Sequence, residues 1–150
     1  MRRTLAALAI IGMTGSASAS DKTDVVAAVN QFLDGFKKGD TKAVLATCAA
    51  EVAILDEFPP YVWQGASACS DWADDFAADA KKNAVTDRVV TLGNPRHVDL
   101  DADRAYLVIP ANLKSKVKGK PASETGSLFT VTLRKWPTGW RITGWAWAKH

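Results

Sequence analysis

The chain has 150 residues, of which 47% are hydrophobic and 23% are charged, with 10 glycines and 6 prolines. These values are typical of a globular protein and exclude a disordered chain, a collagen-like repeat and a disulfide-dense miniprotein. The formal charge is +3, from 19 basic and 16 acidic residues. Arg2 and Arg3 lie in a segment that we expect to be removed, which leaves 17 basic against 16 acidic residues and a charge of +1. The sequence therefore predicts no basic surface for nucleic acid.

Residues 1–19 have the layout of a secretory signal peptide. A basic start precedes an apolar run, and small residues (Ala-Ser-Ala) end the segment at Ala19. The apolar run of about ten residues is too short to span roughly 30 Å of hydrocarbon. We therefore expect an exported protein, periplasmic or secreted, with one domain over residues 20–150 and no membrane attachment after cleavage.

Export changes the interpretation of the two cysteines, Cys48 and Cys69, because an oxidising compartment allows them to pair. The alternative is two small buried apolar side chains. A bond between them would close a loop of about 20 residues and stabilise the fold by roughly 3 kcal/mol. His97 and His150 are the only histidines, and no metal-ligand spacing is present. We expect neither a metal site nor a cofactor.

Helical spacing marks the first half of the chain. Apolar residues recur every three or four positions over residues 24–38, and Asp40 or Thr41 then caps a shorter helix that extends to Cys48. Alternation predicts a short strand over residues 52–56, followed by a loop. The run 67–83 returns to helical spacing.

From Val85 onward the pattern favours strands of about ten residues, separated by turns near residues 94–95, 101–103, 119–121 and 137–139. Short connections predict an antiparallel meander of four long strands. Because the helices come first and the strands last, the fold class is α+β rather than parallel α/β.

The order of these elements resembles the nuclear transport factor 2 and ketosteroid isomerase superfamily, which includes SnoaL-like polyketide cyclases. The matching pieces are NQFLDGFKKGDTKAVLATCAAEVAILDEF, the tetrapeptide VWQG, the helix at Trp72 and the closing strand GWRITGWAWA. The resemblance implies a cone-shaped α+β barrel, with three N-terminal helices packed on a strongly curved antiparallel sheet. It also implies a pocket at the open end and pairing of two copies through the outer face of the sheet.

In the isomerases of this superfamily an aspartate at the end of the first strand moves the proton, and Asp56 occupies the matching place. Asp56 is thus the candidate catalytic residue; the alternative is that it binds the turn that follows. Those isomerases stabilise the enolate with a tyrosine in the first helix and an acid in a late strand. Here the helix position is Phe32, and the late strand offers Thr130 and Thr132 but no carboxylate. Steroid isomerisation by that mechanism is therefore not expected.

Aromatic residues supply most of the candidate ligand-binding positions. Either they line an apolar pocket, or they fill the core of a small domain. The candidates are Phe32 in the first helix, Phe58, Tyr61 and Trp63 in one loop, and Trp72 and Phe76 in the third helix.

Three polar residues complete the candidate binding site. His97 shares a strand face with Asp99, which allows a His-Asp pair, although a surface histidine explains it equally. Tyr106 and Asn112 lie on one face of the next strand.

Strict alternation in the last strand places Ile142, Gly144, Ala146 and Ala148 on one face and the indoles of Trp145 and Trp147 on the other. The resemblance implies that the small residues face the cavity, which leaves the two indoles on the outer face. Exposed indoles are costly unless they are covered. We expect a homodimer that covers them.

The sequence thus favours an exported, homodimeric domain that binds a small apolar or amphipathic molecule. The alternative is an acid–base enzyme, an isomerase, cyclase or lyase, in which Asp56 moves a proton. A third possibility is a structural dimer with a filled cavity.

Overall fold

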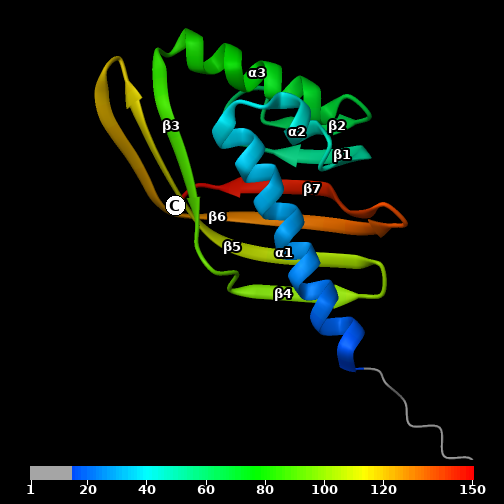
Figure 1. Cartoon of the computed structure of the whole chain (residues 1–150). Coiled ribbons are helices and arrows are strands. Elements are labelled where there is room, and N and C mark those ends of the chain that lie inside the picture. The colour runs from blue at the N-terminus through cyan, green and yellow to red at the C-terminus, as the bar shows by residue number, and fades with distance from the viewer. Residues whose placement is uncertain (1–14) are drawn as a thin grey trace, which may run out of the picture.

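The computed structural model describes residues 15–150. Three helices, α1 (Gly15–Lys38), α2 (Thr41–Leu45) and α3 (Ala68–Lys82), lie against a seven-stranded sheet. Figure 1 shows α1 crossing the sheet diagonally and α3 lying along the end that carries β1 and β2. The strands are β1 (Cys48–Leu55), β2 (Val62–Gly65), β3 (Val85–Leu92), β4 (His97–Asp101), β5 (Arg104–Val117), β6 (Lys120–Trp136) and β7 (Gly139–Ala148).

α1 and α3 form where the apolar spacing predicted helices, but α2 ends at Leu45 rather than extending to Cys48, because Cys48 already pairs as the first residue of β1. In α1, Val25, Val29 and Phe32 are buried against the sheet, as an amphipathic helix requires. Gly39 follows with a φ of +65°, which glycine adopts without strain, and the chain then turns. The Asp40 carboxylate accepts a hydrogen bond of 3.0 Å from the backbone N–H of Ala43 and so caps α2.

The sheet confirms the α+β class and the curved form of the fold, with differences in detail. Its order is β2-β1-β7-β6-β5-β3, and β4 pairs with β5 beyond the end of β3. The sheet is open, and the pair β1–β7 is parallel, so the sheet is mixed rather than wholly antiparallel. The predicted loop after β1 contains the short strand β2, which pairs antiparallel with β1. The predicted turn at residues 94–95 separates β3 from β4, so five strands follow α3 rather than the four long strands predicted.

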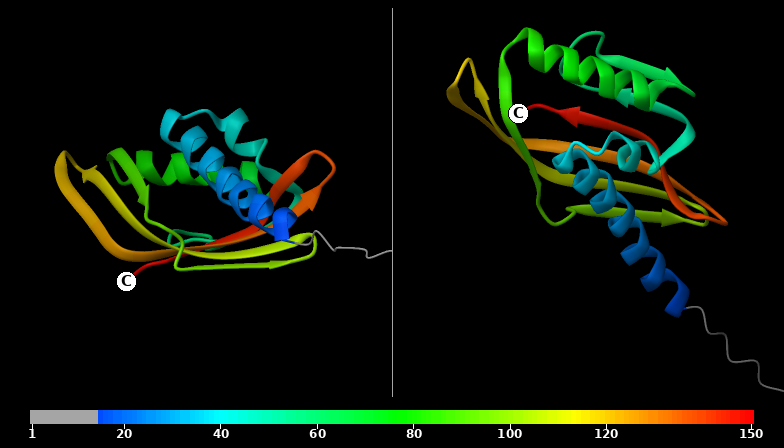
Figure 2. Two further views of the ribbon diagram at one scale, coloured as in Figure 1. Left: turned by 60° about the horizontal axis from the view of Figure 1, so that its bottom comes forward. Right: turned by 45° about the horizontal axis from the view of Figure 1, so that its top comes forward.

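Curvature comes from an irregularity in the β5–β6 hairpin. The register passes from Ala111–Ser127 to Leu113–Glu124, which leaves residues unpaired on the β6 side. The Asn112 side chain accepts a hydrogen bond of 3.1 Å from the backbone N–H of Gly126 at this position. Bulges bend strands and increase their twist. The hairpin accordingly curls toward the helical side of the sheet (Figure 2).

The prediction for the last strand is wrong about which side chains face inward. Trp145 is only 5% exposed and packs against Phe32 and Phe129. The register shift between Thr132 and Leu133 places an extra residue in β7, so alternation changes phase after Ile142. Trp145 therefore faces the core. A Cβ on Gly144 would lie 2.8 Å from the carbonyl oxygen of Ala53, so β1 and β7 approach too closely for a side chain here.

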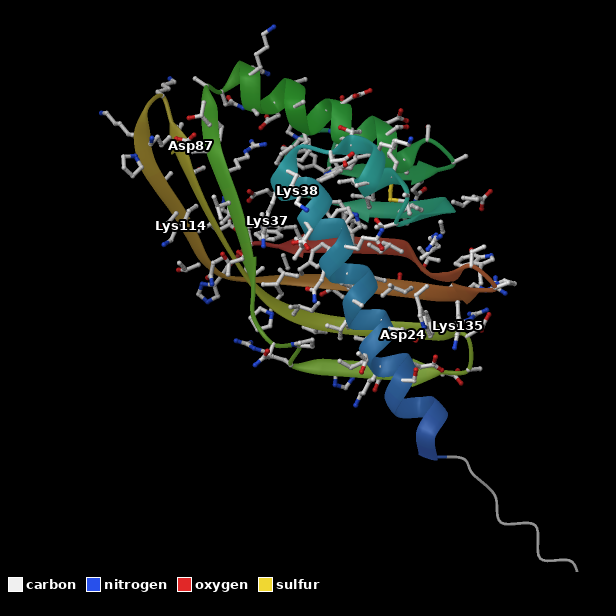
Figure 3. All side chains as sticks on the ribbon, viewed as in Figure 1. Asp24, Lys37, Lys38, Asp87, Lys114 and Lys135 are labelled. Carbon is white, nitrogen blue, oxygen red and sulfur yellow. A yellow bond between two sulfur atoms is a disulfide. The ribbon has the colours of Figure 1, made fainter. Side chains whose placement is uncertain are left out.

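Cys48 and Cys69 form a disulfide, which joins the start of β1 to α3 (yellow in Figure 3). Most of the predicted signal peptide, residues 1–14, lies outside the described residues, and its cleavage stays a prediction. Within residues 15–150, none of the helices has the length and apolar character needed to cross a membrane.

Candidate functional site

A chamber of about 100 Å³ lies between α1, α3 and the inner face of the sheet. Its wall is mainly aromatic and aliphatic, with a few charged groups at one end. The lining side chains come from Phe32, Leu33, Phe36, Asp56, Glu57, Phe58, Trp72, Phe76, Asp79, Arg88, Val90, Leu92, Leu113, Phe129, Trp145 and Trp147.

Packed rings give the wall its shape. The Trp72 and Trp145 rings meet edge to face, with centroids 4.7 Å apart, and Phe32 lies about 6 Å from both. Phe76 lies 5.3 Å from Trp72. Edge-to-face and tilted contacts at these separations are favourable beyond the area they bury. The wall is therefore held by α1, α3 and β7 together.

Asp56 brings a carboxylate into this apolar wall. It stands immediately after β1, where Trp72 Nε1 donates a hydrogen bond of 2.8 Å to its Oδ2 atom. The backbone N–H of Glu57 donates one of 2.7 Å to Oδ1. Burial raises the pKa of Asp56, and the two hydrogen bonds oppose that rise without cancelling it. Asp56 thus both binds the following turn and lines the chamber.

Arg88 is the cation of the chamber wall. Its guanidinium carbon lies 3.9 Å from the centre of the Phe76 ring, and Nη2 lies 3.4 Å from the Asp79 carboxylate. Burial lowers the pKa of Arg88, while the charge of Asp79 opposes this. Arg88 and Asp79 therefore form a largely buried pair at the end of the chamber that opens to solvent.

Charged side chains surround the mouth, a cleft of about 270 Å³ that shares Glu57, Asp79, Arg88 and Leu113 with the chamber. Lys149 bridges two of its carboxylates, at 2.8 Å from Glu57 and 3.3 Å from Glu124. The mouth is thus polar where the chamber is apolar.

Glu124 is also tied to the chamber wall, because Trp147 Nε1 donates a hydrogen bond of 2.8 Å to it. Hydrogen bonds from Ser127 and Trp147 and the charge of Lys149 lower the pKa of Glu124, although its burial acts in the opposite direction.

The structure brings together half of the residues predicted to form the site. The chamber is lined by Asp56, Phe32, Phe58, Trp72 and Phe76.

The other two aromatic candidates lie outside the lining. Trp63 is 5% exposed and contacts the Phe58 ring in a tilted arrangement. Its indole N–H donates a hydrogen bond of 2.8 Å to Asp75, which links β2 to α3. Tyr61 stands in the preceding turn with a φ of +72° and is 55% exposed.

The three polar candidates also lie away from the chamber lining. His97 pairs with Asp99 at 2.8 Å on the exposed side of β4, and its ring contacts that of Tyr106. Tyr106 is exposed on the face of β5 opposite the core. Asn112 holds the bulge of the β5–β6 hairpin. These three residues belong to the outer surface of the sheet and to its bulge rather than to the chamber.

Sequence reasoning missed Arg88 and both indoles of β7. Alternation in β3 places Arg88 on one face with Val90 and Leu92, which is a signal that the sequence contains. The bulge that turns Trp145 and Trp147 inward depends on pairing with β6 and β1 and has no local signal. A homodimer through the outer face stays a prediction, without the support of these two indoles.

No group of three or more His, Cys, Asp or Glu side chains arranged to hold a metal occurs in residues 15–150. Apart from Asp56, the carboxylates of the site are paired with Arg88 or Lys149.

Solved structures with the same fold cover most of the chain. An NTF2-like protein with a cystatin-like fold from Novosphingobium aromaticivorans has 17% identity and a TM-score of 0.72, with 92% of each chain covered. An NTF2-like superfamily protein from Salmonella enterica has 17% identity and a TM-score of 0.73, covering 88% of this chain and 92% of that one. A ketosteroid isomerase-like protein from Erwinia carotovora has 20% identity and a TM-score of 0.66, covering 85% and 94%.

At these identities the solved structures establish the fold and leave the activity open. No match was found among curated proteins. The family model of the SnoaL-like domain matches residues 25–146, which is most of the chain. The chain therefore belongs to the SnoaL-like domain family.

Proposed function

We propose that this protein binds a small amphipathic molecule, which places a compact apolar group in the chamber and a polar group at the mouth. The observation that carries the proposal is an aromatic chamber of about 100 Å³ that stays open in the core and leads to a charged cleft. Binding sites for small molecules have this design, with apolar walls and a few placed polar groups.

The volume of the chamber limits the group that enters it. A buried apolar cavity of about 150 Å³ is known to hold benzene. The chamber is smaller, so we expect a branched group of a few carbon atoms, such as a tert-butyl group, to fill it.

Six tryptophans provide a direct test. Trp72, Trp145 and Trp147 line the chamber, whereas Trp63, Trp136 and Trp140 do not. In a nuclear magnetic resonance titration with tert-butyl alcohol, the indole N–H signals of the first three should shift with a common dissociation constant. The signals of the other three should shift much less.

Two neighbouring residues of β3 provide a matched pair of variants. Val90 lines the chamber and Val89 is 48% exposed. Val90→Phe should fill the chamber and abolish the shifts, and Val89→Phe should leave them unchanged. Equal shifts of all six indoles, or shifts that survive Val90→Phe, would contradict the proposal.

An acid–base enzyme remains the second candidate, and the position of Asp56 favours it. A buried carboxylate with a raised pKa that faces an apolar chamber is suited to take a proton. The described lining includes no hydroxyl group, and Phe32 occupies the position where the isomerases carry a tyrosine. In place of the hydroxyl and acid that the isomerases use, the described lining offers an enolate oxygen the Arg88 guanidinium, which is paired with Asp79, and the buried indole N–H of Trp145, which has no hydrogen-bond partner. Binding is accordingly the proposal that the wall supports better.

We also propose that the protein is exported. Export is supported by the composition of residues 1–19 and by the disulfide, which persists in oxidising compartments. A native mass spectrum of protein from the exporting cell should give a polypeptide that begins at Ser20 and contains one disulfide. An intact Met1 or two free thiols would contradict export. The same spectrum tests the predicted homodimer.

A further inference from the structure

The charge of the site is unbalanced. Four carboxylates, those of Asp56, Glu57, Asp79 and Glu124, line the described chamber and mouth, against the two cations Arg88 and Lys149. Arg88 is paired with Asp79, and Lys149 is shared between Glu57 and Glu124. Lys37 and Lys38 at the end of α1 and Lys114 on the bent hairpin line neither the chamber nor the cleft (Figure 3).

Asp56 is the carboxylate without a direct cationic partner. Its two hydrogen bonds come from the neutral donors Trp72 Nε1 and the backbone N–H of Glu57. Burial, the main influence on the pKa of Asp56, disfavours the charged form, and the more remote charge of Arg88 acts in the opposite direction. A cation placed in the chamber would therefore relieve the cost of burying this charge.

The rest of the wall suits the same kind of group. The rings of Phe32, Trp72, Phe76 and Trp145 surround the chamber. Aromatic faces attract cations electrostatically, and cages of aromatic side chains recognise ammonium groups. The Arg88 guanidinium already lies 3.9 Å above the Phe76 ring, so this wall holds one cation in that manner.

An anionic ligand fits these observations less well. Arg88 is the only described cation in the chamber lining, and Asp79 lies 3.4 Å from its guanidinium. A carboxylate on the ligand would have to displace Asp79 and approach Asp56 and Glu57. Like charges at short range in a site of low dielectric repel strongly.

Resting on the binding function proposed above, we propose that the chamber selects a compact ammonium group, a protonated or quaternary amine, and seats it between the aromatic rings and the Asp56 carboxylate.

The test compares three probes of similar shape and different charge: tetramethylammonium, tert-butyl alcohol and pivalate. Their dissociation constants are measured at low ionic strength from the indole signals of Trp72, Trp145 and Trp147. We expect tetramethylammonium to bind about tenfold more tightly than tert-butyl alcohol, with pivalate the weakest. In Asp56→Asn the preference for the ammonium over the alcohol should shrink severalfold, because the amide preserves the shape and removes the charge while the aromatic rings remain.

A second variant keeps the test decisive if Asp56→Asn does not fold. Glu57→Gln removes one charge at the mouth while Asp56 remains, and it should weaken tetramethylammonium binding without weakening that of the alcohol. If the alcohol or pivalate binds as tightly as tetramethylammonium, and Val90→Phe abolishes all binding, the ammonium proposal is overturned and the binding function stands. If none of the three probes shifts the chamber indoles selectively, the binding function itself fails.

Discussion

The chamber and its mouth share several residues but are held together by different forces. The chamber wall consists of buried rings from α1, α3 and β7, each in contact with several others. The mouth depends on ion pairs of side chains that are partly exposed, such as Lys149 with Glu57 and Glu124. Close packing resists change, whereas exposed ion pairs contribute little and rearrange easily. We infer that the chamber wall stabilises the fold and selects ligands by shape. The mouth selects ligands by their charge.

The largest effect should come from removing a ring of the wall. Trp145→Ala should lower the free energy of unfolding by about 3–5 kcal/mol, because it takes a buried indole away from contact with three other rings. Urea denaturation followed by circular dichroism measures this. Trp136→Ala is the matched control: Trp136 is only partly buried, and we expect a loss of about 1 kcal/mol or less. Similar losses in the two variants would show that the chamber wall does not carry the stability assigned to it.

The disulfide should have the next largest effect, because it joins α3 to β1 next to the chamber. Replacing both Cys48 and Cys69 by serine should reduce the free energy of unfolding by roughly 3 kcal/mol through the greater freedom of the unfolded chain. Reductant added to the wild-type protein should reproduce this loss and leave the double variant unchanged. A further loss in the double variant would mean that reductant acts elsewhere.

Asp56 should make stability depend on pH in a predictable direction. Because burial raises its pKa in the folded protein above the ordinary value of 3.8, folding favours the protonated form. The resulting stabilisation is complete below the unfolded pKa and is lost as pH rises through the folded pKa. Relative to Asp56→Asn, the wild-type protein should therefore gain stability as pH falls from about 7 to about 4.

The comparison of wild type with Asp56→Asn at each pH cancels the titration of the other acids that both proteins share. Urea denaturation at several pH values measures the difference. A wild-type protein that loses stability relative to the variant on acidification would show that Asp56 is held in its charged form.

The smallest effect on stability should come from the mouth. Lys149→Met should change the free energy of unfolding by about 0.5 kcal/mol or less, because the lysine side chain is 60% exposed and solvent screens its ion pairs. Its effect on binding should be larger: losing this cation makes the mouth more negative, so tetramethylammonium should bind more tightly and pivalate more weakly. Unchanged binding of both probes would show that the charge of the mouth does not influence binding in the chamber.

Patterns carried by neighbouring residues predicted much of this molecule. The spacing of apolar residues located α1 and α3, and the short connections located the turns between the long strands. The resemblance to the isomerases singles out Asp56 at the end of the first predicted strand, and the apolar stripes of two helices single out Phe32, Trp72 and Phe76. These properties depend on residues within a few positions of one another, so local sequence is enough to reveal them.

The final strand illustrates where local pattern fails. Its strict alternation assigned Trp145 and Trp147 to the outer face, yet both line the chamber. One extra residue beside Thr132 and Leu133 reverses the facing of every later side chain in β7. That bulge depends on how β7 pairs with β6 and with β1, which is far away along the chain, and no pattern within β7 reveals it.

The sequence by itself determined the α+β class, the helical stripes, the position of Asp56 and a disulfide as a possible bond. Only the tertiary structure decided that the disulfide forms, that the indoles of β7 face inward, and that Arg88 and Glu124 come to the open end of one chamber. The physical reason is that periodicity fixes which residues share a face, whereas register shifts and strand bending fix where that face points.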